Sequence, residues 1–173
     1  MSDQNKDQLC RFLFKELGIR GEIITLDTTF QDALALHHYP TVVAEQLGQT
    51  LAASLLLSAT LKFDGSLILQ IQGDGPITLL VAQANKQQHV RGLAHWNDEI
   101  QSGNLSSLVA NGKLVITLKP SKGQAYQGIV NLEGETLSNA LESYFEQSEQ
   151  LKTRLWFAVN ENKAVGFLLQ ELP

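Results

Sequence analysis

The hydrophobic pattern at the start of the chain is typical of a helix. Leu9, Phe12, Leu13 and Leu17 recur at the spacing of one helical face, and Gly18 follows where a helix would end. We therefore expect the chain to begin with a helix that packs this face against the core.

Two further helices are predicted before residue 60. Thr29 and Asp32 resemble a capping box for a short helix that ends near His37. Pro40 is then expected to be the first residue of a longer helix. After Leu51 this helix has apolar residues on almost every side, which is typical of a helix buried at the centre of a fold.

The middle of the chain predicts an antiparallel meander. Apolar and polar residues alternate over 67–72, as in a strand with one buried face. Residues 73–76 form a dense turn signal, Gly-Asp-Gly-Pro. Two more strands are expected at 77–84 and 89–96, joined around 85–86.

The remaining pattern predicts a helical turn, a hairpin, a late helix and a closing hairpin. These elements are expected at 105–110, at 114–118 with 126–132, at 136–148, and at 155–159 with 165–169. Helices and antiparallel strands fall in separate blocks, which indicates the α+β class. With 173 residues and no linker-like segment, residues 1–173 are expected to form one domain.

Composition and charge narrow the functional classes. Hydrophobic residues make up 43% and charged residues 18%, which is ordinary for a globular protein. The net charge is −5 with a pI near 5.3, and no run of Lys or Arg occurs. A mildly acidic chain has no general attraction to nucleic acid or anionic membranes, so neither is expected as a partner.

Cys10 is the only cysteine, so the chain can form neither an internal disulfide nor a cysteine-rich zinc site. Its place beside the apolar stripe of the first predicted helix indicates a buried or half-buried structural thiol, with a reactive or intermolecular thiol as the alternative. Residues 1–7 lack the apolar core of a signal peptide, and the apolar stretch 51–61 is too short to span a bilayer. We therefore expect a cytoplasmic protein.

The histidines do not form a convincing metal site. His37 and His38 are adjacent at a helix end, so they would point about 100° apart. His89 and His95 fall on one predicted strand and would be roughly 20 Å apart, too far to share an ion. No metal ligand is therefore assigned in this chain.

Catalytic patterns are missing as well. Residues 73–76 lack the Lys-Ser/Thr ending of a phosphate-binding loop, and no serine lies in a Gly-x-Ser-x-Gly elbow. Glu133 and Glu135 are expected to flank a turn rather than to act as a carboxylate pair. Trp96 and Trp156 are expected in the core or at an interface. No catalytic residue is assigned, and the chain is predicted not to be an enzyme.

Two long blocks of the sequence resemble a known family. The first block is LKFDG at 61–65 with QIQGDGP at 70–76; the second is YQGIV at 126–130, LEGETL at 132–137, and 144–155 with its QSEQL. Weaker likeness occurs at 7–14, 20–22 and 90–92. Together they resemble the core of heat-shock protein thirty-three, a family of bacterial redox-regulated holdase chaperones.

The resemblance implies an α+β core that dimerises, in some members by exchanging segments. It implies ATP-independent binding of unfolding proteins during heat and oxidative stress. The family's switch is a separate C-terminal domain in which four cysteines, Cys-x-Cys plus Cys-x-x-Cys, hold zinc when reduced. This chain stops at Pro173, before the linker and that domain, and Cys10 matches none of the four cysteines. Zinc and redox control are therefore expected only in a full-length parent.

Two functions remain open from the sequence. The first is a holdase core that binds unfolded client proteins. The second is a passive dimerisation scaffold whose client binding lies in the missing C-terminal parts. An enzyme or small-ligand binder on this fold is a third, weaker alternative. Pattern alone does not separate a client-binding surface from core strands, so no client-binding residue is assigned.

Overall fold

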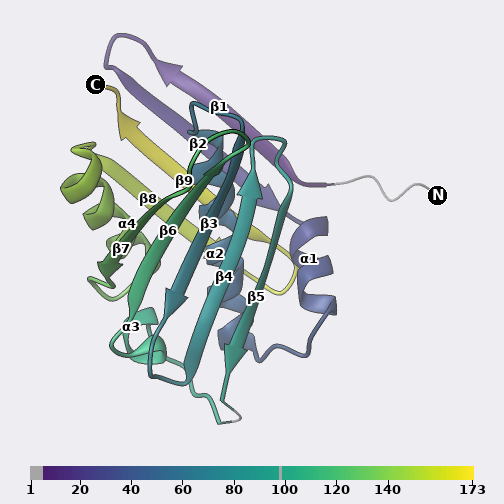
Figure 1. The fold of residues 1–173 in the computed structure, drawn as a ribbon. Coiled ribbons are helices and arrows are strands. Elements are labelled where there is room, and N and C mark those ends of the chain that lie inside the picture. The colour runs from purple at the N-terminus through teal and green to yellow at the C-terminus, as the bar shows by residue number, and fades with distance from the viewer. Residues whose placement is uncertain (1–5, 98) are drawn as a thin grey trace.

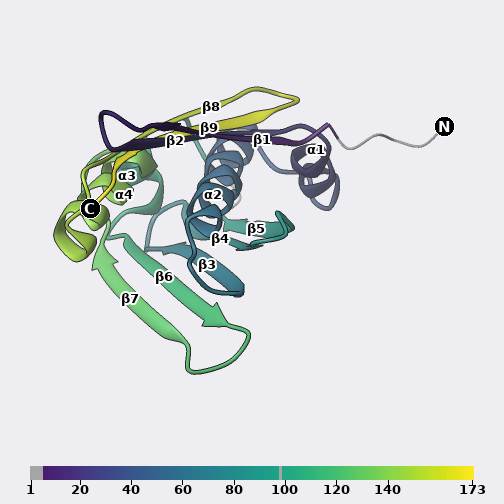
Figure 2. The same ribbon diagram turned by 90° about the horizontal axis from the view of Figure 1, so that it is seen from above.

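The chain folds into two antiparallel sheets with a long helix between them (Figure 1, Figure 2). The computed structural model describes residues 6–97 and 99–173. The elements are β1 (Gln8–Phe14), β2 (Ile19–Leu26), α1 (Thr28–Ala35), α2 (Thr41–Ala59), β3 (Gly65–Gln72), β4 (Ile77–Asn85), β5 (Val90–Trp96), α3 (Leu105–Val109), β6 (Lys113–Pro120), β7 (Tyr126–Asn131), α4 (Leu137–Tyr144), a π-helix (Phe145–Glu149), β8 (Thr153–Val159) and β9 (Ala164–Glu171). The predicted α+β class is confirmed.

Strands from both ends of the chain form the first sheet, and the middle strands form the second. Within the described residues, sheet A has the order β1-β2-β9-β8 and sheet B the order β5-β4-β3-β6-β7. Every neighbouring pair is antiparallel. Figure 2 shows sheet A as one layer, with α2 between it and the strands of sheet B.

The core is built around α2. Leu47, Leu51 and Leu56 on this helix are fully buried, and the helix contacts strands of both sheets. This confirms the prediction of a helix buried at the centre of the fold, with apolar residues on almost every side after Leu51. The helix begins at Thr41, and Pro40 is its N-cap. Pro40 was predicted to be the first residue of the helix, so the helix starts one residue later than predicted. No helix in the described part of the chain is long and apolar enough to cross a membrane.

The predicted first helix is wrong. Residues 8–14 form β1, and a turn with Gly18 at φ +61° leads into β2. Two pairings stabilise this conformation: β1 pairs with β2, and β2 pairs with β9 from the other end of the chain. The residues taken for a buried helical face are not buried, since Leu13 is 49% and Leu17 is 69% exposed.

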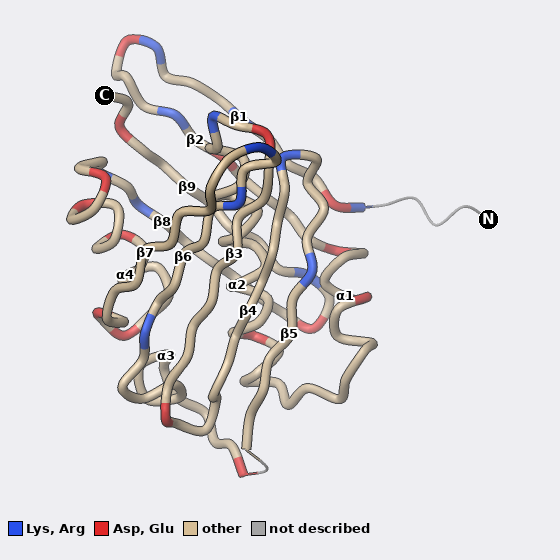
Figure 3. Tube along the Cα trace, in the orientation of Figure 1, with Lys and Arg blue, Asp and Glu red and all other residues tan. Residues whose placement is uncertain are grey.

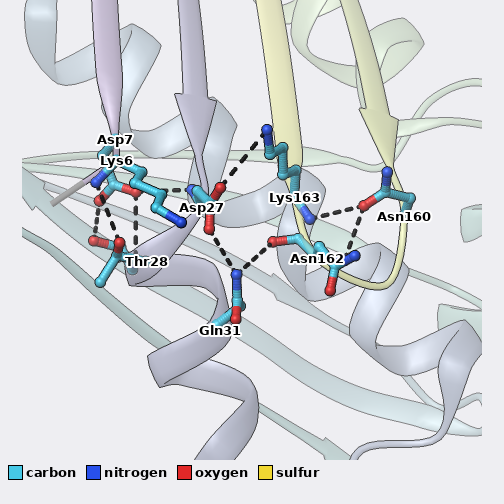
Figure 4. Close-up of polar contacts among 9 residues, drawn as sticks. Lys6, Asp7, Asp27, Thr28, Gln31, Asn160, Asn162 and Lys163 are labelled. Atoms are coloured by element: carbon cyan, nitrogen blue, oxygen red, sulfur yellow. Dashed lines mark hydrogen bonds and ion pairs between the residues drawn. The ribbon is translucent and has the colours of Figure 1, made fainter. Parts of the chain in front are cut away.

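The start of α1 also differs from the predicted capping box. Asp7 accepts hydrogen bonds from the backbone N–H of Asp27 (2.8 Å) and from the N–H and hydroxyl of Thr29. Lys163 Nζ lies 3.6 Å from Asp27 Oδ2, so the β8–β9 turn contacts the same region (Figure 4). The carboxylate of Asp7 therefore satisfies donors at the first turn and fixes the beginning of β1 to α1.

The other predicted elements are confirmed with small shifts at their ends. The strands predicted between residues 67 and 96 correspond to β3, β4 and β5, and the later hairpins correspond to β6–β7 and β8–β9. The late helix is shorter than predicted, because α4 ends at Tyr144 and continues as a π-helix. Its start carries a capping box that was not predicted, formed by Thr136 and Asn139.

Candidate functional site

The histidines are exposed and lie apart from any metal-binding group. His37 and His38 follow α1, His89 precedes β5, and His95 lies on β5. Among the described residues, no group of three or more His, Cys, Asp or Glu side chains could hold a metal ion. The donor set in this part of the chain therefore does not fit the zinc that the family resemblance implies. That zinc remains an expectation for the full-length parent.

The turn at 73–76 is occupied by contacts with the chain itself. Asp74 N donates to Ala110 O (2.9 Å) and Gly75 N donates to Val109 O (2.7 Å). These backbone donors would have to be unpaired to hold a phosphate. The turn therefore packs against α3 and does not form an anion site.

The remaining sequence candidates are scattered. Glu133 accepts a hydrogen bond from Gln147 Nε2 (3.2 Å) at the surface. Trp96 packs against the core, with its ring 5.2 Å from that of Tyr39. Trp156 is 49% exposed and lies on β8. Trp156 leads to a surface feature of sheet A.

The outer side of sheet A carries a continuous apolar surface. Strand register places Cys10, Ile23, Phe167 and Trp156 in one row across β1, β2, β9 and β8. Side chains on a sheet alternate between its faces, so these residues share the face opposite to buried Ile24. We call this surface the outer apolar face; its members are Cys10, Phe12, Phe14, Ile23, Trp156, Val165, Phe167 and Leu169.

Aromatic rings cover much of this face. The rings of Trp156 and Phe167 stack with centroids 5.1 Å apart, and Phe12 lies 6.2 Å from Phe167. The ring of Phe12 lies over Gly21, where a Cβ atom would come within 2.2 Å of it. Phe14 packs edge-on to Phe12 at 5.5 Å and is itself 49% exposed. In Figure 2 no other element covers this side of the sheet in the described part of the chain.

An exposed apolar surface of this kind is uncommon on a protein that acts alone. Single exposed hydrophobic residues are normal, but contiguous apolar patches usually mark sites of interaction. Cys10 belongs to this surface and is exposed, so the prediction of a buried or half-buried thiol is wrong. The reason is that it lies on the outer side of an edge strand and not on a helix.

A charged group lies beneath the same sheet. Glu22, on the inner side of β2, has a side chain only 5% exposed. Its Oε1 lies 3.9 Å from Arg11 Nε, while Oε2 has no hydrogen-bond partner among the described residues. Burial raises the pKa of the Glu22 carboxyl, and the charges of Arg11 and Arg20 lower it by less.

Replacing this carboxylate should stabilise the protein at neutral pH. The raised pKa means that the folded chain binds a proton more tightly than the unfolded chain does. The ionised Glu22 carboxylate therefore destabilises the folded chain fully at pH values above its folded pKa. This destabilisation disappears as the pH falls toward the pKa of the carboxyl in the unfolded chain. We expect Glu22→Gln to raise the free energy of unfolding by about 1 kcal/mol at pH 7.5, with the gain vanishing near pH 4.

Urea unfolding at several pH values measures this difference. Glu171→Gln is the matched control, because Glu171 is half exposed and makes only a surface pair with Lys152 at 3.6 Å. A Glu22→Gln variant less stable than the parent at pH 7.5 would show that the carboxylate is favourable where it lies.

The charged residues of this chain are dispersed. Figure 3 shows positive and negative positions interspersed along the trace, without one long basic stretch. Together with the net charge of −5, this leaves the outer apolar face as the surface with the clearest capacity to bind a partner. This face can bind apolar side chains of a partner, because contact removes both apolar surfaces from water.

Comparisons with known proteins place the chain in a family. A family model described as Hsp33 protein matches residues 7–173. The chain is 53% identical to a 33 kDa chaperonin of Nitrosococcus oceani over 169 residues, covering 98% of this chain and 58% of that protein. It is 47% identical to a 33 kDa chaperonin of Vibrio cholerae, covering 96% and 59%. The chain thus spans about three fifths of the length of these relatives.

The fold has a solved counterpart. The crystal structure of the Thermotoga maritima 33 kDa chaperonin superposes with a TM-score of 0.80 at 22% identity, covering 95% of this chain and 60% of that one. The relatives carry the name of a chaperone, so the comparisons define a chaperone family and agree with the prediction that the chain is not an enzyme. The chain belongs to the Hsp33 family.

Proposed function

We propose that this chain is the core of an ATP-independent holdase that binds unfolding proteins on the outer apolar face. The observation that carries the proposal is the row of exposed or partly exposed apolar side chains across all four strands of sheet A, ending at Trp156. Unfolding proteins expose apolar segments, and burial against this face removes both surfaces from water. Such binding requires no nucleotide.

The full-length parent is proposed to be a cytoplasmic, redox-regulated protein that acts under heat and oxidative stress. Its zinc and its disulfides would lie in the part of the family's length that this chain does not span. Support comes from the family relationship and from the lack of a metal-ligand cluster among the described residues. Bound zinc and titratable thiols in the full-length protein, before and after peroxide, test this part of the proposal.

Light scattering tests the holdase activity. A model protein is diluted from denaturant with and without this chain at molar excess, in the absence of ATP. We expect the chain to slow and reduce aggregation. Unchanged scattering at every excess tried would remove the holdase proposal for this chain.

A passive dimerisation scaffold is the second candidate. The same outer apolar face would suit a second copy of the chain, because two apolar faces can bury each other from water. No other part of the described residues covers this face. In that case scattering would not change, while sedimentation would show a dimer that dissociates when the face is made polar. The two measurements together separate the two functions.

A further inference from the structure

The sheets have edge strands that differ in how their backbone is protected. The edges of sheet A are β1 and β8, and those of sheet B are β5 and β7. An edge strand presents unpaired N–H and C=O groups that can pair with another chain, so folded proteins usually cover or interrupt such edges. An edge left open is therefore informative.

Side chains cap two of these edges. On β8, Leu155 N donates a hydrogen bond of 2.9 Å to Glu142 Oε1 of α4. On β5, Ala94 N donates to the hydroxyl of Tyr39, which lies between α1 and α2, at 3.5 Å. In both cases a residue from a neighbouring helix or loop occupies a position that an added strand would need.

The outer edge of β1 has no such cap among the described residues. Leu172 N donates to Gly18 O (2.7 Å), so the backbone of Gly18 points toward the β9 side. The backbone N–H and C=O groups of successive strand residues point alternately to the two neighbouring strands. Even-numbered residues of β2 therefore bond to β9 and odd-numbered residues bond to β1. The β1 partners of these odd-numbered residues are even-numbered. The N–H and C=O groups of Leu9, Arg11 and Leu13 therefore point outward from the sheet edge.

The side chains of β1 distinguish it from the other uncapped edge, β7. On the outer side of β1, Cys10, Phe12 and Phe14 continue the outer apolar face to the edge of the sheet. On the corresponding side of β7 the row includes the polar residues Gln127 and Asn131. Of the two uncapped edges in the described part of the chain, β1 is the one whose outward backbone groups adjoin the outer apolar face.

We propose that an extended segment of a non-native polypeptide binds along β1 as an additional antiparallel strand of sheet A. Backbone hydrogen bonds to Leu9, Arg11 and Leu13 would hold the segment, and its alternate apolar side chains would extend the outer apolar face. This inference rests on the proposed holdase function and gives it a mode of recognition that uses the client's backbone and its pattern of apolar residues, not one particular sequence.

The fit of β1 to a second copy of itself is poor. When two copies of β1 pair as antiparallel strands about a two-fold axis, the outer side chains of both copies stay on the same side of the sheet. Even-numbered residues then lie opposite even-numbered residues, and odd-numbered opposite odd-numbered. The register with the greatest overlap of Gln8–Phe14 places Arg11 directly opposite Arg11 of the other copy. Like charges directly opposite one another destabilise a strand pair. A heterologous segment has no such conflict.

Arg11 also sets a preference in the bound segment. Its side chain is 53% exposed, and its contact with Glu22 is on the inner side of the sheet. A bound residue opposite Arg11 meets a half-exposed guanidinium, so glutamate or threonine is favoured there over lysine. The partner is thus an extended segment with apolar residues at every second position and polar or acidic residues between them.

A labelled nine-residue peptide with apolar residues at even positions and Thr or Glu at odd positions is the probe. With its apolar side on the outer face, the N–H groups of its odd residues point toward β1. N-methylation at a central odd residue is expected to weaken binding at least roughly tenfold, since a hydrogen bond is lost and a methyl group blocks the approach. N-methylation at a central even residue should leave fluorescence anisotropy titrations unchanged.

Leu13→Pro and Leu13→Ala form the matched pair of protein variants. Both remove the same exposed side chain, but only proline removes the outward N–H, and edge strands accept proline at such positions. We expect Leu13→Pro to weaken peptide binding roughly three- to tenfold and Leu13→Ala to change it little. Ile129→Pro on β7 removes an outward donor from the other open edge and should have no effect.

The outcomes separate this inference from the holdase proposal. Equal binding of the two methylated peptides, or no peptide binding at all, overturns edge pairing even if aggregation is still suppressed. Methylation-sensitive binding without suppression of aggregation supports edge pairing and removes the holdase function. Dimers of the parent chain that Leu13→Pro converts to monomers, without peptide binding, would assign the edge to a second copy. If Leu13→Pro fails to fold, the methylated peptides decide with the unmodified chain.

Discussion

Replacing Leu56 by alanine is expected to lower the free energy of unfolding by about 3 kcal/mol. Leu56 is fully buried on α2, and its Cδ1 lies 2.8 Å from where a Cβ of Gly166 on β9 would be. The side chain therefore fills the space that the glycine leaves between the helix and sheet A. Its removal loses apolar burial and leaves a cavity between rigid elements.

Urea unfolding followed by circular dichroism measures this change. Leu36→Ala is the matched control, because Leu36 is 73% exposed at the end of α1 and the same atoms are removed. It should alter stability by no more than about 0.5 kcal/mol. Equal effects of the two substitutions would contradict the position of α2 between the sheets.

The elements that the sequence predicts well are those with a local signal. α2 has apolar residues on almost every side after Leu51 because both sheets pack on it, and this pattern indicates a buried helix. β3 alternates buried Leu67, Leu69 and Ile71 with less buried residues, so its period of two is visible. In each case burial follows the periodicity of the element itself.

β1 was mistaken for a helix because both of its sides carry apolar residues. Leu9 and Leu13 lie on the inner side, while Phe12 lies on the outer apolar face. Read together, they imitate the spacing of one helical face. The alternation of Cys10, Phe12 and Phe14, followed by the Gly18 turn, was the signal that could have identified a hairpin.

The outer apolar face could not be assembled from the sequence. Its central row joins Ile23 near one end of the chain to Phe167 and Trp156 near the other. Such pairing depends on long-range register, which a local pattern does not encode.

Charging the outer apolar face should abolish most client binding. In Trp156→Asp the largest exposed ring of the face is replaced by a carboxylate, which loses the apolar contact and must be desolvated by any bound segment. The loss in affinity for a non-native protein is expected to be at least about tenfold, as for an aromatic anchor at an interface. Because Trp156 is half exposed, the fold should be retained, and circular dichroism checks this.

The control for this variant is Ile129→Asp. Ile129 is 59% exposed on β7, so the substitution also replaces an exposed apolar residue by a carboxylate, but on sheet B. Net charge changes equally in the two variants. A general effect of charge or solubility would therefore act on both, whereas loss of the outer apolar face acts on one.

The measurement that tests the central claim most directly is the binding of a labelled, permanently unfolded polypeptide to the parent chain, Trp156→Asp and Ile129→Asp, followed by fluorescence anisotropy. If clients bind the outer apolar face, Trp156→Asp binds at least about tenfold more weakly and Ile129→Asp binds like the parent chain. Equal affinities of the parent chain and a folded Trp156→Asp would contradict the claim and place client binding elsewhere.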